Sequence, residues 1–96
     1  MSSPAPPARL HAVAHGLVQG VGFRYFVLLH GHQRGLRGWV RNRPDGSVEC
    51  VAEGPRPVLE HLLEDLREGP RGARVSRVDV EWQAPRGDLR AFDVAF

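Results

Sequence analysis

The chain has 96 residues, which suffices for one small hydrophobic core and leaves no room for a second domain of ordinary size. It is 42% hydrophobic and 25% charged, and no apolar run approaches the about 20 residues that cross a membrane, so we expect a soluble protein without membrane contact. Its net charge of +2 arises from 13 arginines scattered among 11 acidic residues, a pattern that favours small anionic ligands over nucleic acid.

The first eight residues lack the basic and apolar segments of a signal peptide. We therefore expect residues 1–8 to form a flexible tail before a single domain at residues 9–96. The only cysteine, Cys50, cannot form a disulfide within the chain and alternates with apolar neighbours, which favours a buried position and a cytoplasmic location.

Alternation of side chains predicts a strand from Arg9 to Leu17. A turn with two glycines follows, and helical spacing begins at about Phe23 and ends at Gly35. The later elements are indicated in the same way, by alternation, an Asp-Gly hairpin signal and leucine spacing. They are strands at Arg37 to Asn42 and Ser47 to Glu53, a helix between Pro55 and Gly69, and strands at Arg74 to Trp82 and Ala91 to Phe96.

This order is the split βαβ arrangement of ferredoxin-like α+β domains, an antiparallel sheet with a short fifth strand and two helices on one face. In that topology the first two strands run parallel with the third between them, because the crossover helix returns the chain to its starting edge. The turn after the first strand and Asn42, the only asparagine, would then lie at one end of the sheet.

The turn itself carries the strongest functional signal. Two glycines allow its backbone N–H groups to curl around an anion, the helix that follows adds its positive N-terminal dipole, and Arg24 supplies a planar fork of donors. We expect a phosphate site without metal, formed by Gln19, Gly20, Val21, Gly22, Phe23 and Arg24.

No serine, cysteine, histidine or aspartate constellation suggests a covalent intermediate; His11 and His15, for example, lie roughly 13 Å apart along a strand. A hydrolase that has only backbone donors, one arginine and one asparagine must act by positioning and charge stabilisation. Its substrate should therefore have a good leaving group, as an acyl phosphate does. Asn42 would orient the attacking water, and the phosphate oxygens would accept its proton.

Each of these residues also has an ordinary structural interpretation. A lone Gly-x-Gly is often only a turn, Arg24 could be a surface charge, and Asn42 is a common residue at the end of a strand. We expect Tyr25 and Trp39 to be packing residues beside the site and not ligand contacts.

The motifs together resemble those of the acylphosphatase family. The resemblance rests on Val18 to Arg24, then on residues 35–42 and 44–49, and continues through residues 53–54 and 69–70 to Phe92. It implies a ferredoxin-like fold and the hydrolysis of acyl phosphates to a carboxylate and inorganic phosphate, with no cofactor or metal. Inorganic phosphate would then be both a product and an inhibitor of the enzyme. It also implies that Arg24 binds the phosphate and that Asn42 positions the water.

Two positions depart from this resemblance. Similar chains often carry alanine where this one has Gly31 and leucine where it has Arg34, and glycine inside a helix costs about 0.5–1 kcal/mol relative to alanine. We therefore expect the first helix to be less well packed.

Two other functions stay open at this stage. Acylphosphatase-like domains also occur as non-catalytic or channelling modules in larger proteins that handle carbamoyl phosphate. The same topology serves RNA-binding domains, which stack bases on aromatic residues of the central strands, but residues 48–52 contain none. We expect a monomer.

Overall fold

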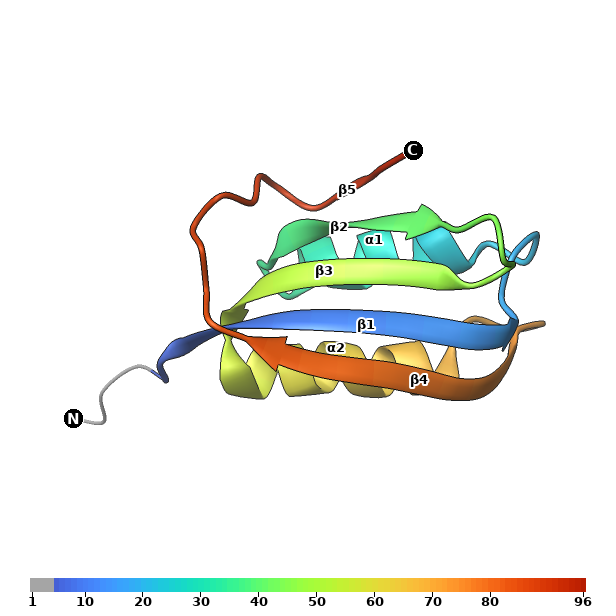
Figure 1. Ribbon diagram of the computed structural model, residues 1–96, viewed down its shortest axis with the longest axis horizontal. Coiled ribbons are helices and arrows are strands. Elements are labelled where there is room, and N and C mark those ends of the chain that lie inside the picture. The colour runs from blue at the N-terminus through green and yellow to red at the C-terminus, as the bar shows by residue number, and fades with distance from the viewer. Residues whose placement is uncertain (1–4) are drawn as a thin grey trace.

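The computed structural model describes residues 5–96 as one five-stranded sheet and two helices (Figure 1). In chain order the elements are β1 (Pro7–Leu17), α1 (Phe23–Gln33), β2 (Arg37–Asn42), β3 (Val48–Pro55), α2 (Arg56–Glu68), β4 (Arg74–Gln83) and β5 (Asp93–Val94). The tail expected at residues 1–8 includes residues 1–4, which lie outside the described residues.

The strand order is β4-β1-β3-β2-β5. Because β1 and β2 both pair antiparallel with β3, they run parallel to each other, and both helices cover the same face of the sheet (Figure 1). This confirms the ferredoxin-like α+β fold. The sheet is mixed and not wholly antiparallel, because the segment after β4 crosses the end of the sheet and turns back, so that β5 pairs in parallel with β2.

The ends of several strands differ from the expectation, most clearly those of β1 and β5. β1 begins two residues earlier than expected because Pro7 and Ala8 pair with the end of β3. The last strand is much shorter than the expected Ala91 to Phe96. Asp93 and Val94 pair with β2 as a regular strand, whereas Ala91 forms only an isolated bridge to β2 and Phe96 is fully exposed.

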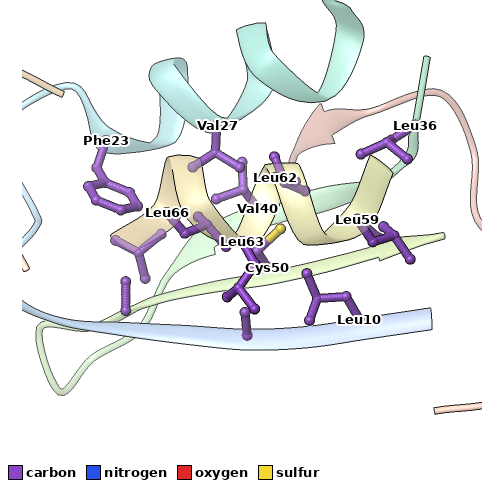
Figure 2. Packing of buried hydrophobic residues seen from close by; sticks show 14 of the residues in the cluster. Leu10, Phe23, Val27, Leu36, Val40, Cys50, Leu59, Leu62, Leu63 and Leu66 are labelled. Atoms are coloured by element: carbon purple, nitrogen blue, oxygen red, sulfur yellow. The ribbon is translucent and has the colours of Figure 1, made fainter. Parts of the chain in front are cut away.

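The core lies between the sheet and the two helices (Figure 2). The four leucines of α2 at positions 59, 62, 63 and 66 are buried, as their spacing predicts, against the inward-facing residues of β1, β2 and β3. Cys50 belongs to this core, where burial, with a smaller contribution from Glu49, raises the pKa of its thiol to about 12. The thiol therefore stays protonated at neutral pH, as a packing residue should.

The two positions that depart from the family resemblance both make tertiary contacts. Arg34 donates two hydrogen bonds to the Asp65 carboxylate, at 2.9 and 3.1 Å, and so ties α1 to α2. Gly31 is buried, and the ring of Phe92 lies directly against it. The expectation of poor packing in α1 is therefore wrong, because glycine makes room for a buried ring.

Gly31→Ala should destabilise the protein although alanine is the better helix former. A Cβ on Gly31 would lie 2.5 Å from Cδ2 of Phe92, a ring that is only 2% exposed and has little room to move. Overpacking of this kind costs about 1–3 kcal/mol, which exceeds the about 0.5–1 kcal/mol gained in helix propensity. Urea denaturation should show a net loss of about 1 kcal/mol in the free energy of unfolding.

The double-mutant cycle with Phe92→Leu provides the control. In the Phe92→Leu background the added methyl group has space, so Gly31→Ala should be neutral or stabilising there. Stabilisation by Gly31→Ala in the wild-type background would contradict the packing role of this glycine.

Candidate active site

The loop between β1 and α1 has the backbone conformation that its glycines predict. Gly20 and Gly22 adopt φ of 75° and 77°, in the left-handed region that other residues rarely occupy. No atom would obstruct a Cβ at either position, so the requirement for glycine comes from the backbone and not from crowding. Gly22 is also the N-cap of α1, and the loop therefore leads directly into the helix.

The backbone donors of this segment are free within the described residues 5–96. No side chain caps α1 and its first turn contains no acidic residue. The N–H groups of residues 19–25 donate no hydrogen bond to another described residue, whereas the N–H of Phe26 bonds to the carbonyl of Gly22. The helix dipole adds positive potential at the same point, so the loop favours an anion.

A surface pocket of about 390 Å³ opens above these donors. It is lined by Val18, Gly20, Gly22, Phe23, Arg24, Tyr25, Asn42, Val94 and Phe96. Arg24 reaches it from the first turn of α1, and Asn42 from the last residue of β2. The topology thus brings together the two polar side chains that sequence analysis singled out. Within the described part of the chain, Arg24 is the only lining residue with a charged side chain, and it forms no ion pair.

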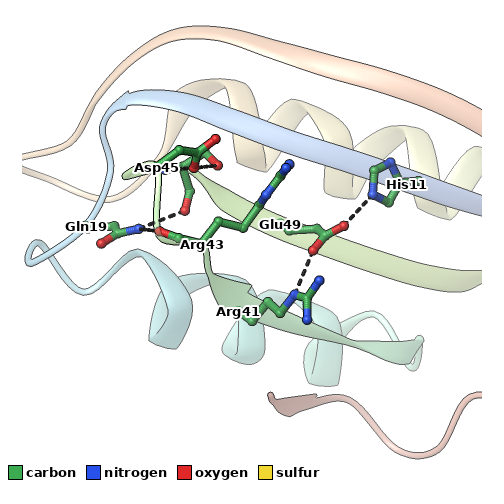
Figure 3. Close-up of polar contacts among 7 residues, drawn as sticks. His11, Gln19, Arg41, Arg43, Asp45 and Glu49 are labelled. Atoms are coloured by element: carbon green, nitrogen blue, oxygen red, sulfur yellow. Dashed lines mark hydrogen bonds and ion pairs between the residues drawn. The ribbon is translucent and has the colours of Figure 1, made fainter. Parts of the chain in front are cut away.

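Gln19 and Val21 do not line this pocket. The amide of Gln19 instead donates to the backbone carbonyls of Arg43, at 2.8 Å, and Ser47, at 2.9 Å, in the turn between β2 and β3 (Figure 3). The turn is itself braced, since Ser47 donates hydrogen bonds to Asp45 through its hydroxyl and its N–H; these lower the pKa of Asp45. Gln19 therefore fixes the loop against the turn that follows Asn42.

Gln19→Met should loosen the loop without removing side-chain volume. We expect a loss of about 1–2 kcal/mol in the free energy of unfolding, because two hydrogen bonds are lost while each carbonyl keeps another donor. The affinity for inorganic phosphate, measured by calorimetry, should fall about tenfold because the donors lose their fixed position. Gln83→Met on β4, outside the pocket, should leave phosphate affinity unchanged, and equal affinities in all three proteins would contradict the bracing role.

Two exposed aromatic residues line the pocket, although one of them was expected to pack. Tyr25, expected to pack, is 66% exposed and lines the pocket, and so does Phe96. The helical pattern could have predicted the exposure of Tyr25. Residues two apart on a helix point in nearly opposite directions, and Phe23 is buried. Trp39 lies outside the pocket, half-buried, with the Arg41 guanidinium 5.1 Å from its ring centre.

Two histidines of β1 each lie beside a different carboxylate. His11 Nε2 lies 2.7 Å from Glu49 Oε2 on the open face of the sheet (Figure 3), and His15 Nε2 lies 2.9 Å from Asp79 Oδ2. Burial opposes ionisation of Glu49, but hydrogen bonds from His11 and Arg41 hold its pKa below the ordinary value. Within residues 5–96 no three His, Cys, Asp or Glu side chains are grouped so that they could hold a metal ion.

The fold and the pocket define a small ferredoxin-like domain with a pocket at the start of its first helix. A family model described as Acylphosphatase matches residues 10–94. The chain is 51% identical over 87 residues to an acylphosphatase of Nocardia farcinica, covering 91% of this chain and 87% of that one. The protein belongs to the acylphosphatase family.

Solved structures show the same architecture. The acylphosphatase of Bacillus subtilis superimposes with a TM-score of 0.89 at 36% identity, over 93% of this chain and 99% of the other. HypF of T. kodakarensis superimposes with a TM-score of 0.79 at 37% identity, over 93% of this chain but only 12% of that one. The fold therefore also occurs as a small part of a much longer chain. No helix among the described residues has the length and apolar character needed to cross a membrane.

Proposed function

We propose that this protein hydrolyses the carboxyl–phosphate bond of acyl phosphates and releases a carboxylate and inorganic phosphate. The observation that carries this proposal is the meeting of Arg24 and Asn42 in one pocket, beside the free backbone donors of the loop at residues 18–24. Family membership supports the same activity.

Phosphate binding is assigned to the loop and Arg24. The planar guanidinium can donate to two oxygens of a phosphoryl group, while the N–H groups of residues 19–24 and the α1 dipole hold the remaining charge. Phosphoryl transfer proceeds through a loose transition state with charge spread over the equatorial oxygens, so fixed donors stabilise it without covalent participation of the protein.

Asn42 is proposed to position the water molecule that attacks the phosphorus. Its side-chain carbonyl can accept a hydrogen bond from water and hold the oxygen in line with the phosphorus, but an amide is too weak a base to take the proton. As the water oxygen bonds to phosphorus, the bond from phosphorus to the acyl oxygen breaks and the carboxylate leaves as an anion. The proton passes to a phosphoryl oxygen of the substrate itself.

We propose that the reaction uses neither metal nor cofactor, because Arg24 and the backbone supply the positive charge that phosphoryl transfer requires. The test is hydrolysis of benzoyl phosphate in the presence of a chelator, with inorganic phosphate added as a competitor. Turnover should persist in the chelator, and phosphate should raise KM without changing kcat. Absence of turnover by the wild-type protein would refute the enzymatic function, and loss of turnover only in the chelator would refute the metal-free mechanism.

The alternative function is that of a non-catalytic module that binds acyl or carbamoyl phosphate. It is kept because the chain resembles part of the longer HypF chain. It predicts that carbamoyl phosphate binds without release of inorganic phosphate. An RNA-binding role has less support, because the central strands β1 and β3 carry no phenylalanine, tyrosine or tryptophan. Their open face instead holds ion pairs such as Arg9 with Glu53.

We also propose that residues 9–96 form the single domain of a monomeric, cytoplasmic protein. A lone buried cysteine suits a reducing compartment, because the fold requires no disulfide. Sedimentation of the purified protein over a range of concentrations should give the mass of one chain, 10.7 kDa.

A further inference from the structure

Part of the pocket lining is apolar and includes exposed aromatic rings. Tyr25 rises from the first turn of α1 with 66% of its surface exposed, and Phe96 extends beyond β5, fully exposed. Val18 and Val94 continue this apolar lining. Two large aromatic side chains from different elements thus border the same pocket, and neither is needed to complete the core.

Among the described residues that line the pocket, Arg24 is the only one with a charged side chain. Binding of the phosphoryl group would occupy this charge. A second negative charge on the acyl part of a substrate would find no cation in the pocket. The volume of about 390 Å³ lies within the range of sites for small organic ligands, so there is room for an organic group beside the phosphate.

We propose that Tyr25 and Phe96 determine specificity by contacting the acyl group, so that these two side chains favour substrates with an aromatic acyl group over those with a small one. This inference rests on the hydrolytic function proposed above. A flat acyl group leaving the phosphate can pack on the ring of Tyr25, with Phe96 on its outer side, in the offset or edge-to-face arrangements that aromatic pairs prefer.

These contacts have a kinetic signature. The acyl group remains against the rings in both the bound substrate and the transition state, because the reacting bond lies on the phosphate side. Interactions that are equal in the two states lower KM and leave kcat nearly unchanged. Loss of an aromatic side chain should therefore raise KM for an aromatic substrate, whereas damage to the phosphate site would also weaken the binding of inorganic phosphate.

The experiment compares benzoyl phosphate with acetyl phosphate in the wild-type protein and in Tyr25→Ala, Phe96→Ala and the double variant. We expect KM for benzoyl phosphate to rise about three- to tenfold for each single variant, the size of one aromatic contact. The ratio of kcat/KM values, benzoyl to acetyl, should fall by at least about threefold. Intrinsic reactivity of the two substrates cancels because each variant is compared with the wild-type protein.

Two matched variants serve as controls. Tyr25→Phe keeps the ring and should keep the wild-type ratio. Leu29→Ala removes an exposed apolar side chain one turn further along α1, outside the pocket, and should change neither substrate's kinetics. The inhibition constant of inorganic phosphate should be the same in the aromatic variants as in the wild-type protein.

The outcomes separate the two levels of the proposal. An unchanged benzoyl-to-acetyl ratio in the double variant would overturn the specificity role while leaving the hydrolytic function intact. A fall in the ratio for Leu29→Ala equal to that for Tyr25→Ala would also overturn it. Failure of the wild-type protein to hydrolyse either substrate would instead refute the hydrolytic function, and the inference with it.

Discussion

Arg24→Ala is expected to abolish phosphate binding and to lower kcat/KM for an acyl phosphate by about 10³-fold or more. The reason is that, among the described residues that line the pocket, Arg24 alone has a charged side chain, so no other side chain there can neutralise the phosphoryl group. Calorimetry with inorganic phosphate and steady-state hydrolysis of benzoyl phosphate measure the two effects.

Arg24→Lys separates charge from geometry. Lysine keeps the positive charge but replaces the planar fork with a single ammonium, so phosphate affinity should return in part while kcat stays low. The fold should be unaffected by either change, because Arg24 forms no ion pair within residues 5–96. A positive side chain at a helix N-terminus is unfavourable, so Arg24→Ala should even raise the free energy of unfolding, by about 0.5 kcal/mol. Wild-type activity in Arg24→Ala would remove this residue from the mechanism.

Asn42→Ala is expected to lower kcat by about 10²-fold or more while the affinity for inorganic phosphate stays within about twofold. The two effects separate because Asn42 comes from the end of β2 and not from the loop, and its proposed role is to position the water and not to bind the phosphate. Single-turnover hydrolysis together with phosphate calorimetry distinguishes the two contributions.

The companion variant Asn42→Asp tests how near this position lies to the bound anion. A carboxylate in the pocket would repel the phosphoryl group, so phosphate affinity should fall as well as kcat. Full activity in Asn42→Ala would refute the water-positioning role, and loss of phosphate affinity in that variant would place Asn42 among the phosphate-binding groups.

Much of the site could be predicted from sequence because it depends on local signals and on topology. Gly20 and Gly22 indicate a left-handed turn, and the split βαβ order alone places Asn42 at the same end of the sheet as that turn. These features follow from backbone conformation and strand direction, which short sequence patterns specify well.

The features that could not be predicted are contacts between side chains far apart in the chain. Gln19 carries no mark of its bonds to Arg43 and Ser47, because those acceptors are backbone carbonyls. Gly31 looks unfavourable in a helix until Phe92 is found against it. The strand expected at Ala91 to Phe96 was too long, because side-chain alternation runs on to Phe96 whereas only Asp93 and Val94 pair with β2 as a regular strand.

The position of β3 between β1 and β2 has a consequence for how the protein refolds. Arg24 and Asn42 are close in sequence, yet β1, which leads into the loop before Arg24, and β2, which ends at Asn42, are hydrogen-bonded to each other only through β3. The pairing of β3 with β1 links residues as distant as Pro7 and Pro55. Closing such long loops costs chain entropy and slows folding. The active site is therefore complete only after the central, non-local strand pairing has formed. The rate at which hydrolytic activity returns during refolding should report the rate of that late step.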